Sequence, residues 1–294
     1  MTPLIAAAAV SGSGDAWWTQ IVDFSDYGEL IGLLRNSILA GAVLALIGGL
    51  IAVFVVQRDM AFAVHGISEL SFSGGAAGLL LGIGVVPGAL LGSMLAALII
   101  GLMGTRERER NSSIAVLMPF GLGLGILFLT LAPGRTANKF GLLTGQIVAI
   151  DDPQLGALSA IAAVALIGIL LIWRPLSFAS LDPQVARARG LPMRGLSLAF
   201  MALLGLTVAV SVQIVGALLV MSVLVTPAAA AMRLSASPVV VPVLSVVFAC
   251  VSVVGGIMLA LGSSVPISPF VTTISFLIYL IARLVERSRA DVRR

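Results

Sequence analysis

The chain has 294 residues, of which 59% are hydrophobic and only 10% are charged. Soluble domains carry about 25% charged residues, so this chain lacks the polar surface that a water-soluble fold needs. The pI is near 10.2, but the net charge is only +4 and the basic residues lie in short segments between apolar runs, which argues against a nucleic-acid partner. The single cysteine, Cys250, excludes an intrachain disulfide and a cysteine metal cluster. The composition predicts an all-α, polytopic bundle of transmembrane helices.

The apolar runs set the expected spans, because a bilayer core of about 30 Å needs roughly 20 apolar residues per helix. We expect a break inside the long apolar run 195–231, either as two helices joined near Ser211-Val212-Gln213 or as one long span followed by a half-helix. The predicted spans lie near residues 29–56, 60–81, 87–104, 113–131, 155–173, 195–212, 213–231, 238–261 and 267–284.

Arginine-rich loops predict which ends of these spans face the cytoplasm. Placing most arginines inside puts the N-terminus outside and the C-terminus in the cytoplasm, which requires an odd number of spans. Nine spans satisfy this, and eight with a re-entrant piece is the alternative. We therefore expect an outer tail over 1–28, one transmembrane domain over 29–284 and a cytoplasmic tail over 285–294. In the outer loop 132–154, the apolar stretch 140–150 suits a short interfacial or re-entrant helix.

Two ionisable residues of the second span are the main functional candidates. Glu69 lies about nine residues into the span, so a rise of 1.5 Å per residue puts it roughly 14 Å deep. His65 is the only histidine of the chain and lies four residues earlier, on the same helix face. Charged groups are costly in hydrocarbon, and an ionisable residue inside a membrane therefore indicates function.

An imidazole and a carboxylate on one face suit a divalent cation such as zinc, and manganese accepts the same donors. Two ligands are too few for a cage, but a homodimer with the site on its two-fold axis would supply four. Two other interpretations stay open, namely a hydrogen bond that ties helices together and a proton relay.

Three segments resemble the zinc/manganese-type metal ABC transporter permease family. Residues 58–74 (RDMAFAVHGISELSFSG) are similar to its Gly-Asp…Ser-His signature, with the carboxylate and imidazole exchanged at His65 and Glu69. Residues 215–231 (VGALLVMSVLVTPAAAA) resemble its Gly-x-Leu-Leu-Val…Pro-Ala-Ala-x-Ala helix. Residues 181–191 (LDPQVARARGL) resemble its Asp-Pro-Glu-x-Ala-x-x-x-Gly segment, with Gln184 for the usual Glu.

The resemblance implies the fold of an ABC importer permease in the bacterial plasma (inner) membrane. It implies a cytoplasmic coupling segment over 176–192, with Asp182, Ala186 and Gly190 at the motif positions, that docks on a separate ATPase. Pro183 suits the start of a short helix there and Gly190 its end. A separate ATPase fits the absence of a phosphate-binding Gly-x-x-x-x-Gly-Lys-Ser/Thr loop. Further implied partners are a second copy of the chain and an extracytoplasmic metal-binding protein, besides membrane lipid.

We therefore predict a transporter permease, not an enzyme, that moves zinc or manganese past His65 and Glu69 without a permanent cofactor. Ser68, Ser71 and Ser73 are weaker candidates for pathway contacts. A proton-coupled secondary carrier and an ABC permease for a metal chelate, such as a siderophore or haem, are the alternatives. An intramembrane enzyme is disfavoured, because the chain has no second histidine and no aspartate within a span.

Overall fold

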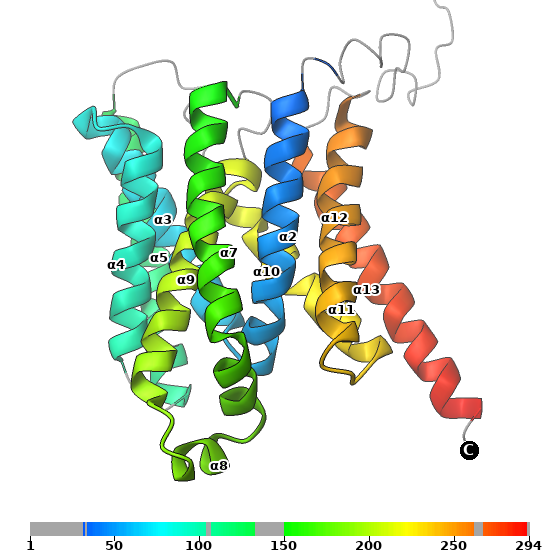
Figure 1. Ribbon diagram of the computed structural model, residues 1–294. Helices are drawn as coiled ribbons and strands as arrows, with labels where there is room; N and C mark the ends of the chain where they lie inside the picture. The colour runs from blue at the N-terminus through cyan, green and yellow to red at the C-terminus, as the bar shows by residue number, and fades with distance from the viewer. Residues whose placement is uncertain (1–31, 33, 104–106, 133–149, 262–266, 293–294) are drawn as a thin grey trace, which may run out of the picture.

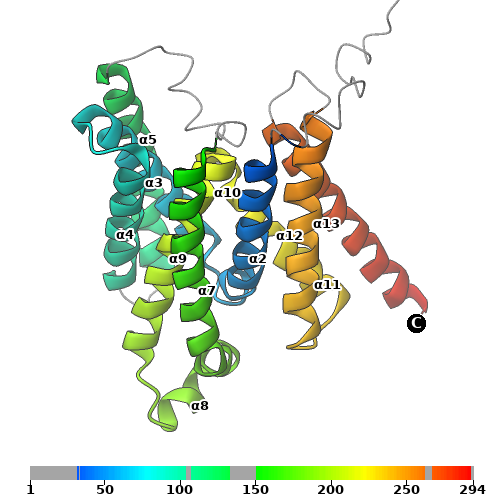
Figure 2. The same ribbon diagram turned by 45° about the horizontal axis from the view of Figure 1, so that its top comes forward.

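The computed structural model describes residue 32 and residues 34–103, 107–132, 150–261 and 267–292. The chain runs up and down through a bundle of helices (Figure 1), with α3, α4 and α5 on one side and α12 and α13 on the other (Figures 1 and 2). The short helix α8 and the C-terminal end of α13 lie at the same end of the bundle, which we call the α8 end. The predicted outer tail 1–28 and almost all of the predicted re-entrant stretch 140–150 fall outside the described residues.

The described chain contains long helices joined mostly by tight turns. In order, they and the short elements between them are α2 (Arg35–Gln57), α3 (Ala61–Leu81), α4 (Val85–Leu102), α5 (Glu107–Leu131), α7 (Asp152–Leu181), α8 (Pro183–Ala188), α9 (Met193–Val215), η2 (Ala217–Leu219), α10 (Val220–Leu224), α11 (Thr226–Leu234), α12 (Val240–Leu261) and α13 (Ile267–Val292). By length and composition, eight segments of this described part could cross a membrane, the three pieces from η2 to α11 counting as one.

Helix α3 is not among those eight, although its 21 residues match the thickness of a bilayer core. Its composition explains this, because it carries His65, Glu69 and three serines. The chain enters α3 directly from α2 and leaves it directly for α4, so α3 also traverses the bundle. With α3, the described residues make nine traverses, which is the number that the arginine distribution favoured.

Several predicted spans are shorter than the helices that contain them. Helix α5 begins at Glu107 instead of residue 113, α7 continues to Leu181 instead of 173, and α13 continues to Val292 instead of 284. The added residues are largely polar or charged, and residues such as Glu and Arg are good helix formers. The apolar runs therefore predicted the central part of each helix and missed extensions at its ends, one of which, on α7, contributes the buried residues Leu176 and Ala179 to the core.

The predicted break near Ser211-Val212-Gln213 is wrong, because α9 continues through these residues to Val215. Their polar groups are satisfied inside the bundle: the Ser211 hydroxyl donates to the Thr207 carbonyl at 2.8 Å, and the Gln213 amide donates to the Val85 carbonyl at 3.4 Å. The helix ends at Gly216, whose φ of 85° lies in the left-handed region that favours glycine. The chain then descends as η2, α10 and α11, so a broken span follows one full helix.

Glycines bring α3 and α4 unusually close together. Gly74 and Gly78 on α3 face Gly88 and Gly92 on α4, and a Cβ at Gly74 would collide with the Gly88 carbonyl oxygen. Small residues spaced four apart allow membrane helices to approach backbone to backbone, where dispersion contacts and interhelical hydrogen bonds hold them. This packing fixes α3, and therefore the His65/Glu69 pair, against its neighbour.

Candidate functional site

His65 and Glu69 lie on one face of α3, as their spacing predicts. The His65 Nε2 and Glu69 Oε1 atoms are 3.6 Å apart. This exceeds the usual 2.7–3.2 Å range of hydrogen bonds involving nitrogen, so the two side chains face each other without a good hydrogen bond. The direct hydrogen bond that would give the pair a purely structural role is therefore not formed.

The two side chains differ sharply in burial. The Glu69 side chain is 3% exposed, whereas that of His65 is 34% exposed. Within the part of the chain that the structure describes, the buried atoms Glu69 Oε2 and His65 Nδ1 have no hydrogen-bond partner. A buried polar atom without a partner is costly, and a bound ion or water is one way to satisfy it.

Helix α5 closes one side of the pair. Gly121 of α5 lies against the backbone of Glu69, where an added Cβ would be 3.3 Å from the Glu69 Cβ. One turn earlier on α3, Gly66 packs against Ile114 of α5. The two glycines allow α5 to approach α3 closely at Gly66 and at Glu69, so the burial of Glu69 depends on small residues of two helices.

The three candidate serines have different contacts. The Ser68 hydroxyl donates to the His65 carbonyl of its own helix at 2.8 Å. The Ser71 hydroxyl donates to the Ala89 carbonyl of α4 at 3.1 Å, and the Ser73 hydroxyl donates to the Gly121 carbonyl of α5. Ser71 and Ser73 thus tie α3 to the helices on its two sides, next to Glu69. A direct contact of these serines with a transported ion stays a prediction.

The described residues of one chain do not form a complete metal site. Among the described residues, no group of three or more His, Cys, Asp or Glu side chains is arranged to hold an ion. His65 and Glu69 are therefore two candidate donors, and the His65 side chain is 34% exposed.

The segment predicted to couple to an ATPase forms a short helix, α8, within 176–192. Asp182 caps it, because its Oδ1 accepts from the backbone N–H groups of Gln184 and Val185 at 3.1 and 2.9 Å. Pro183 is its first residue, and Gly190 follows its end with a φ of 78°, as the sequence predicted. Ala186 is fully buried and fixes α8 to the bundle, while the rest of α8 is exposed.

The sequence interpretation missed the residues that hold the pair in place. Gly66, Gly121 and the α4 glycines were not predicted, although the alternation of glycines at 121, 123 and 125 was visible. Only Gly121 and Gly125 of these three lie in tight contacts, against Glu69 and Phe72 respectively. Spacing alone could not separate them from Gly123, which has open space around it.

Fold and site together define a polytopic helical membrane protein with an imidazole and a carboxylate on one inner helix. A family model described as the ABC 3 transport family matches residues 31–286, and the chain belongs to this family. The family membership predicted from the three motifs is thereby confirmed, as is the all-α fold class. As a member of a transport family, the chain is a transport subunit and not an enzyme.

Individual relatives agree with this assignment. The chain is 29% identical to the manganese transport system membrane protein MntC of Halalkalibacterium halodurans, over 76% of this chain and 77% of the relative. It is 26% identical to the high-affinity zinc uptake system membrane protein ZnuB of Haemophilus influenzae, over 87% of this chain and 98% of the relative. Among solved structures it resembles PsaBC from Streptococcus pneumoniae in complex with Fab, with a TM-score of 0.79 and 25% identity over 88% of this chain and 95% of that chain.

Proposed function

We propose that this chain is the permease subunit of an ATP-driven importer of manganese or zinc, and that the ion passes His65 and Glu69 at the centre of a homodimer. The observation that carries the proposal is the pair itself: two metal-ligating groups face each other inside the bundle without a good hydrogen bond between them. The relatives named for manganese transport and for zinc uptake support both ions as cargo.

The spacing of the donor atoms suits a shared ion. Metal–nitrogen and metal–oxygen distances of about 2.0–2.2 Å at a tetrahedral angle separate two donors by about 3.4 Å. The observed separation of 3.6 Å between His65 Nε2 and Glu69 Oε1 is close to this value. The pair can therefore accept an ion with little movement, and the unbonded Oε2 of Glu69 offers a further donor.

The exposed side of His65 supports a dimer-centred site. Phe62, one turn before His65, is 53% exposed, so this part of α3 presents an apolar surface beside a polar ligand. A second copy packed on the same face would cover Phe62 and bring a second imidazole and carboxylate to the two-fold axis. Four donors, completed by water where needed, would hold an ion loosely enough to release it.

The α8 end is proposed to face the cytoplasm, with the N-terminus outside and the C-terminus inside. Arg58, Arg187 and Arg194 lie at this end, as the preference of arginine for the cytoplasmic side requires. The exposed surface of α8, capped by Asp182 and anchored by Ala186, is proposed to dock on a separate ATPase subunit. An extracytoplasmic metal-binding protein would deliver the ion at the opposite end.

The test is uptake of radioactive manganese and zinc into proteoliposomes that contain this chain, its ATPase and its metal-binding protein. His65→Ala and Glu69→Gln should each reduce ATP-dependent uptake at least about 100-fold, since even changes around metal ligands cost 10–100-fold in affinity or activity. Glu286→Gln is the matched control, because Glu286 is an exposed carboxylate on α13 that pairs with Arg233 away from α3; it should retain uptake. Uptake without ATP would favour a secondary carrier, and uptake indifferent to both substitutions would refute the site.

A further inference from the structure

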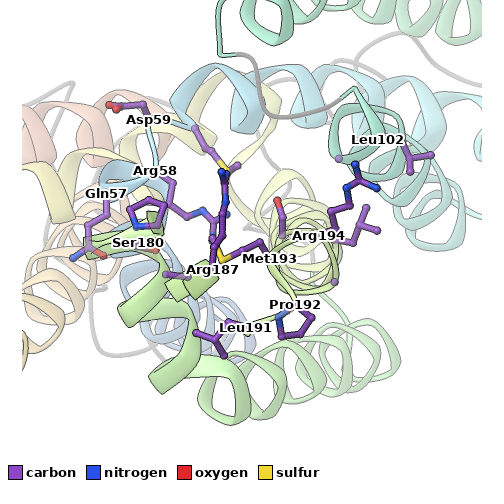
Figure 3. Close-up of a pocket in the computed structure, with 17 residues that line it drawn as sticks. Gln57, Arg58, Asp59, Leu102, Ser180, Arg187, Leu191, Pro192, Met193 and Arg194 are labelled. Carbon is purple, nitrogen blue, oxygen red and sulfur yellow. The ribbon is translucent and has the colours of Figure 1, made fainter. Parts of the chain in front are cut away.

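A second polar feature lies at the α8 end of the bundle, and neither His65 nor Glu69 is among its described lining residues. A cavity of about 1040 Å³ opens between the α2–α3 turn, the end of α4, the end of α7, α8 and the start of α9 (Figure 3). Neither the metal pair nor the exposed surface of α8 accounts for a hollow of this size, which raises the question of what it binds.

The cavity is lined by three arginines from three separate elements. Arg58 comes from the α2–α3 turn, Arg187 from α8 and Arg194 from the first turn of α9. Among the described lining residues Asp59 is the only acidic one, and Figure 3 shows its carboxylate directed away from the labelled arginines. The lining therefore carries an excess of positive charge that favours an anionic ligand.

The structure fixes the position of one of these arginines, and the other two have no ion-pair partner among the described residues. The Arg58 guanidinium lies over the ring of Phe200, 5.4 Å from its centroid, which fixes it at the wall of the cavity. Among the residues whose side chains the structure describes, neither Arg187 nor Arg194 forms an ion pair. Helix α9, 23 residues long, also begins at the cavity without a side-chain cap, so its positive dipole end adds to the same field.

An apolar strip continues from the rim of the cavity into the membrane. Leu102 lines the cavity and is 65% exposed. Leu98, Leu95 and Leu91 follow on the same face of α4 at helical spacing and are also exposed. A ligand that fits both parts has a negatively charged head and long apolar chains.

We propose that the cavity is a binding site for an anionic phospholipid, with the phosphate headgroup held by Arg187, Arg194 and Arg58 and the acyl chains lying along the α4 leucines. Basic pockets between membrane helices on the cytoplasmic side are suited to phosphate-bearing headgroups, which arginine binds through paired N–H groups. The bound lipid would fill the space behind α8 and connect α8 with α4 and α9. This site is separate from the metal pair and does not depend on the identity of the cargo.

The test measures binding of fluorescently labelled phosphatidylglycerol to the purified full chain in a nonionic detergent, with equally labelled phosphatidylcholine as the neutral comparison. Phosphatidylglycerol should bind at least tenfold more tightly. Arg187→Gln combined with Arg194→Gln should weaken its binding about 30-fold, because each basic residue near an anionic lipid contributes about a fivefold gain. Correct folding is checked by size-exclusion chromatography, and Arg194→Gln alone, with an expected fivefold loss, replaces the double variant if that variant does not fold.

The matched control is Arg283→Gln combined with Arg287→Gln, which removes two exposed arginines from α13 outside the cavity. It should change binding by less than about twofold. An equal loss in the control would overturn the proposal by showing unspecific attraction, and an unchanged affinity in the cavity variant would overturn it directly. Inorganic phosphate that displaces the labelled lipid as well as unlabelled phosphatidylglycerol does would also overturn it, because the ligand would then be free phosphate. Transport is not measured, so the outcome is independent of the proposed metal pathway.

Discussion

Helices α3 and α4 are packed backbone to backbone, but they differ in what they carry and where it lies. Helix α3 holds a histidine, a glutamate and three serines, and most of these side chains are buried between α4 and α5. Helix α4 is almost entirely apolar, and its large side chains Leu91, Leu95, Leu98 and Leu102 are exposed. In the bilayer the apolar face needs no cover, whereas each polar group must find a partner inside the protein.

This contrast identifies what holds the two helices together. Lipid tails are as apolar as leucine, so burying leucine between helices gains little, and close packing and hydrogen bonds must supply the attraction. The glycine contacts between α3 and α4 and the Ser71–Ala89 hydrogen bond are of this kind. The polar residues of α3 therefore divide into two groups: some bind neighbouring helices, and His65 and Glu69 are the two that we propose bind the ion.

The largest effect is expected from placing a charge on the outer face of α4. Leu95→Asp should disfavour insertion of α4 by about 3 kcal/mol, because an acidic residue near the centre of a lipid-facing helix costs this much. Leu95→Ala is the control and should remain close to wild type. The amount of intact chain in washed membranes measures the effect. Normal recovery of Leu95→Asp would mean that this face of α4 does not contact lipid.

A smaller loss is expected where α3 meets α4. Gly74→Ala places a methyl group against the Gly88 carbonyl and should lower the free energy of unfolding by about 1–3 kcal/mol relative to Gly123→Ala. The Gly123 position on α5 has open space around it. Both substitutions raise helix propensity by the same amount, so the difference between the stabilities of the two variants measures the cost of the collision. Thermal unfolding in detergent, followed by a dye that reacts with the single Cys250 as it becomes accessible, gives the comparison. Equal transition temperatures for the two variants would contradict backbone-to-backbone packing.

The smallest effect concerns the serines. Ser71→Ala removes the hydrogen bond to Ala89 of α4 and should lower stability by about 0.6 kcal/mol, the average for a hydrogen bond between membrane helices. Ser68→Ala, which removes only a bond within α3, should have less effect in the same unfolding assay. A larger loss of stability for Ser68→Ala than for Ser71→Ala would contradict the claim that Ser71, and not Ser68, joins α3 to a neighbouring helix.

The sequence predicted α3 almost to the residue, and the reasons are local. Charged Arg58 and Asp59 before it and Gly82 after it delimit an apolar run of the right length, and a spacing of four puts His65 and Glu69 on one face. The end of α9 at Gly216 was missed, although this glycine lies in a segment that resembles the family, because the chain contains 32 glycines and a positive φ leaves no mark on composition. The contact of Gly121 with Glu69 was missed for a different reason. Which glycine of α5 touches α3 depends on how both helices are rotated about their axes, and a single sequence does not determine that rotation.

The most direct test of the central claim is an exchange of the pair. His65→Asp combined with Glu69→His restores the carboxylate-first order of the family's signature and keeps one imidazole and one carboxylate on the same face of α3. If these side chains bind the transported ion, ATP-dependent manganese or zinc uptake by the exchanged variant should stay within about tenfold of wild type, while Glu69→Gln falls about 100-fold. If the exchanged variant folds normally and is as inactive as Glu69→Gln, or if Glu69→Gln itself transports at the wild-type rate, the pair is not the ion's binding site.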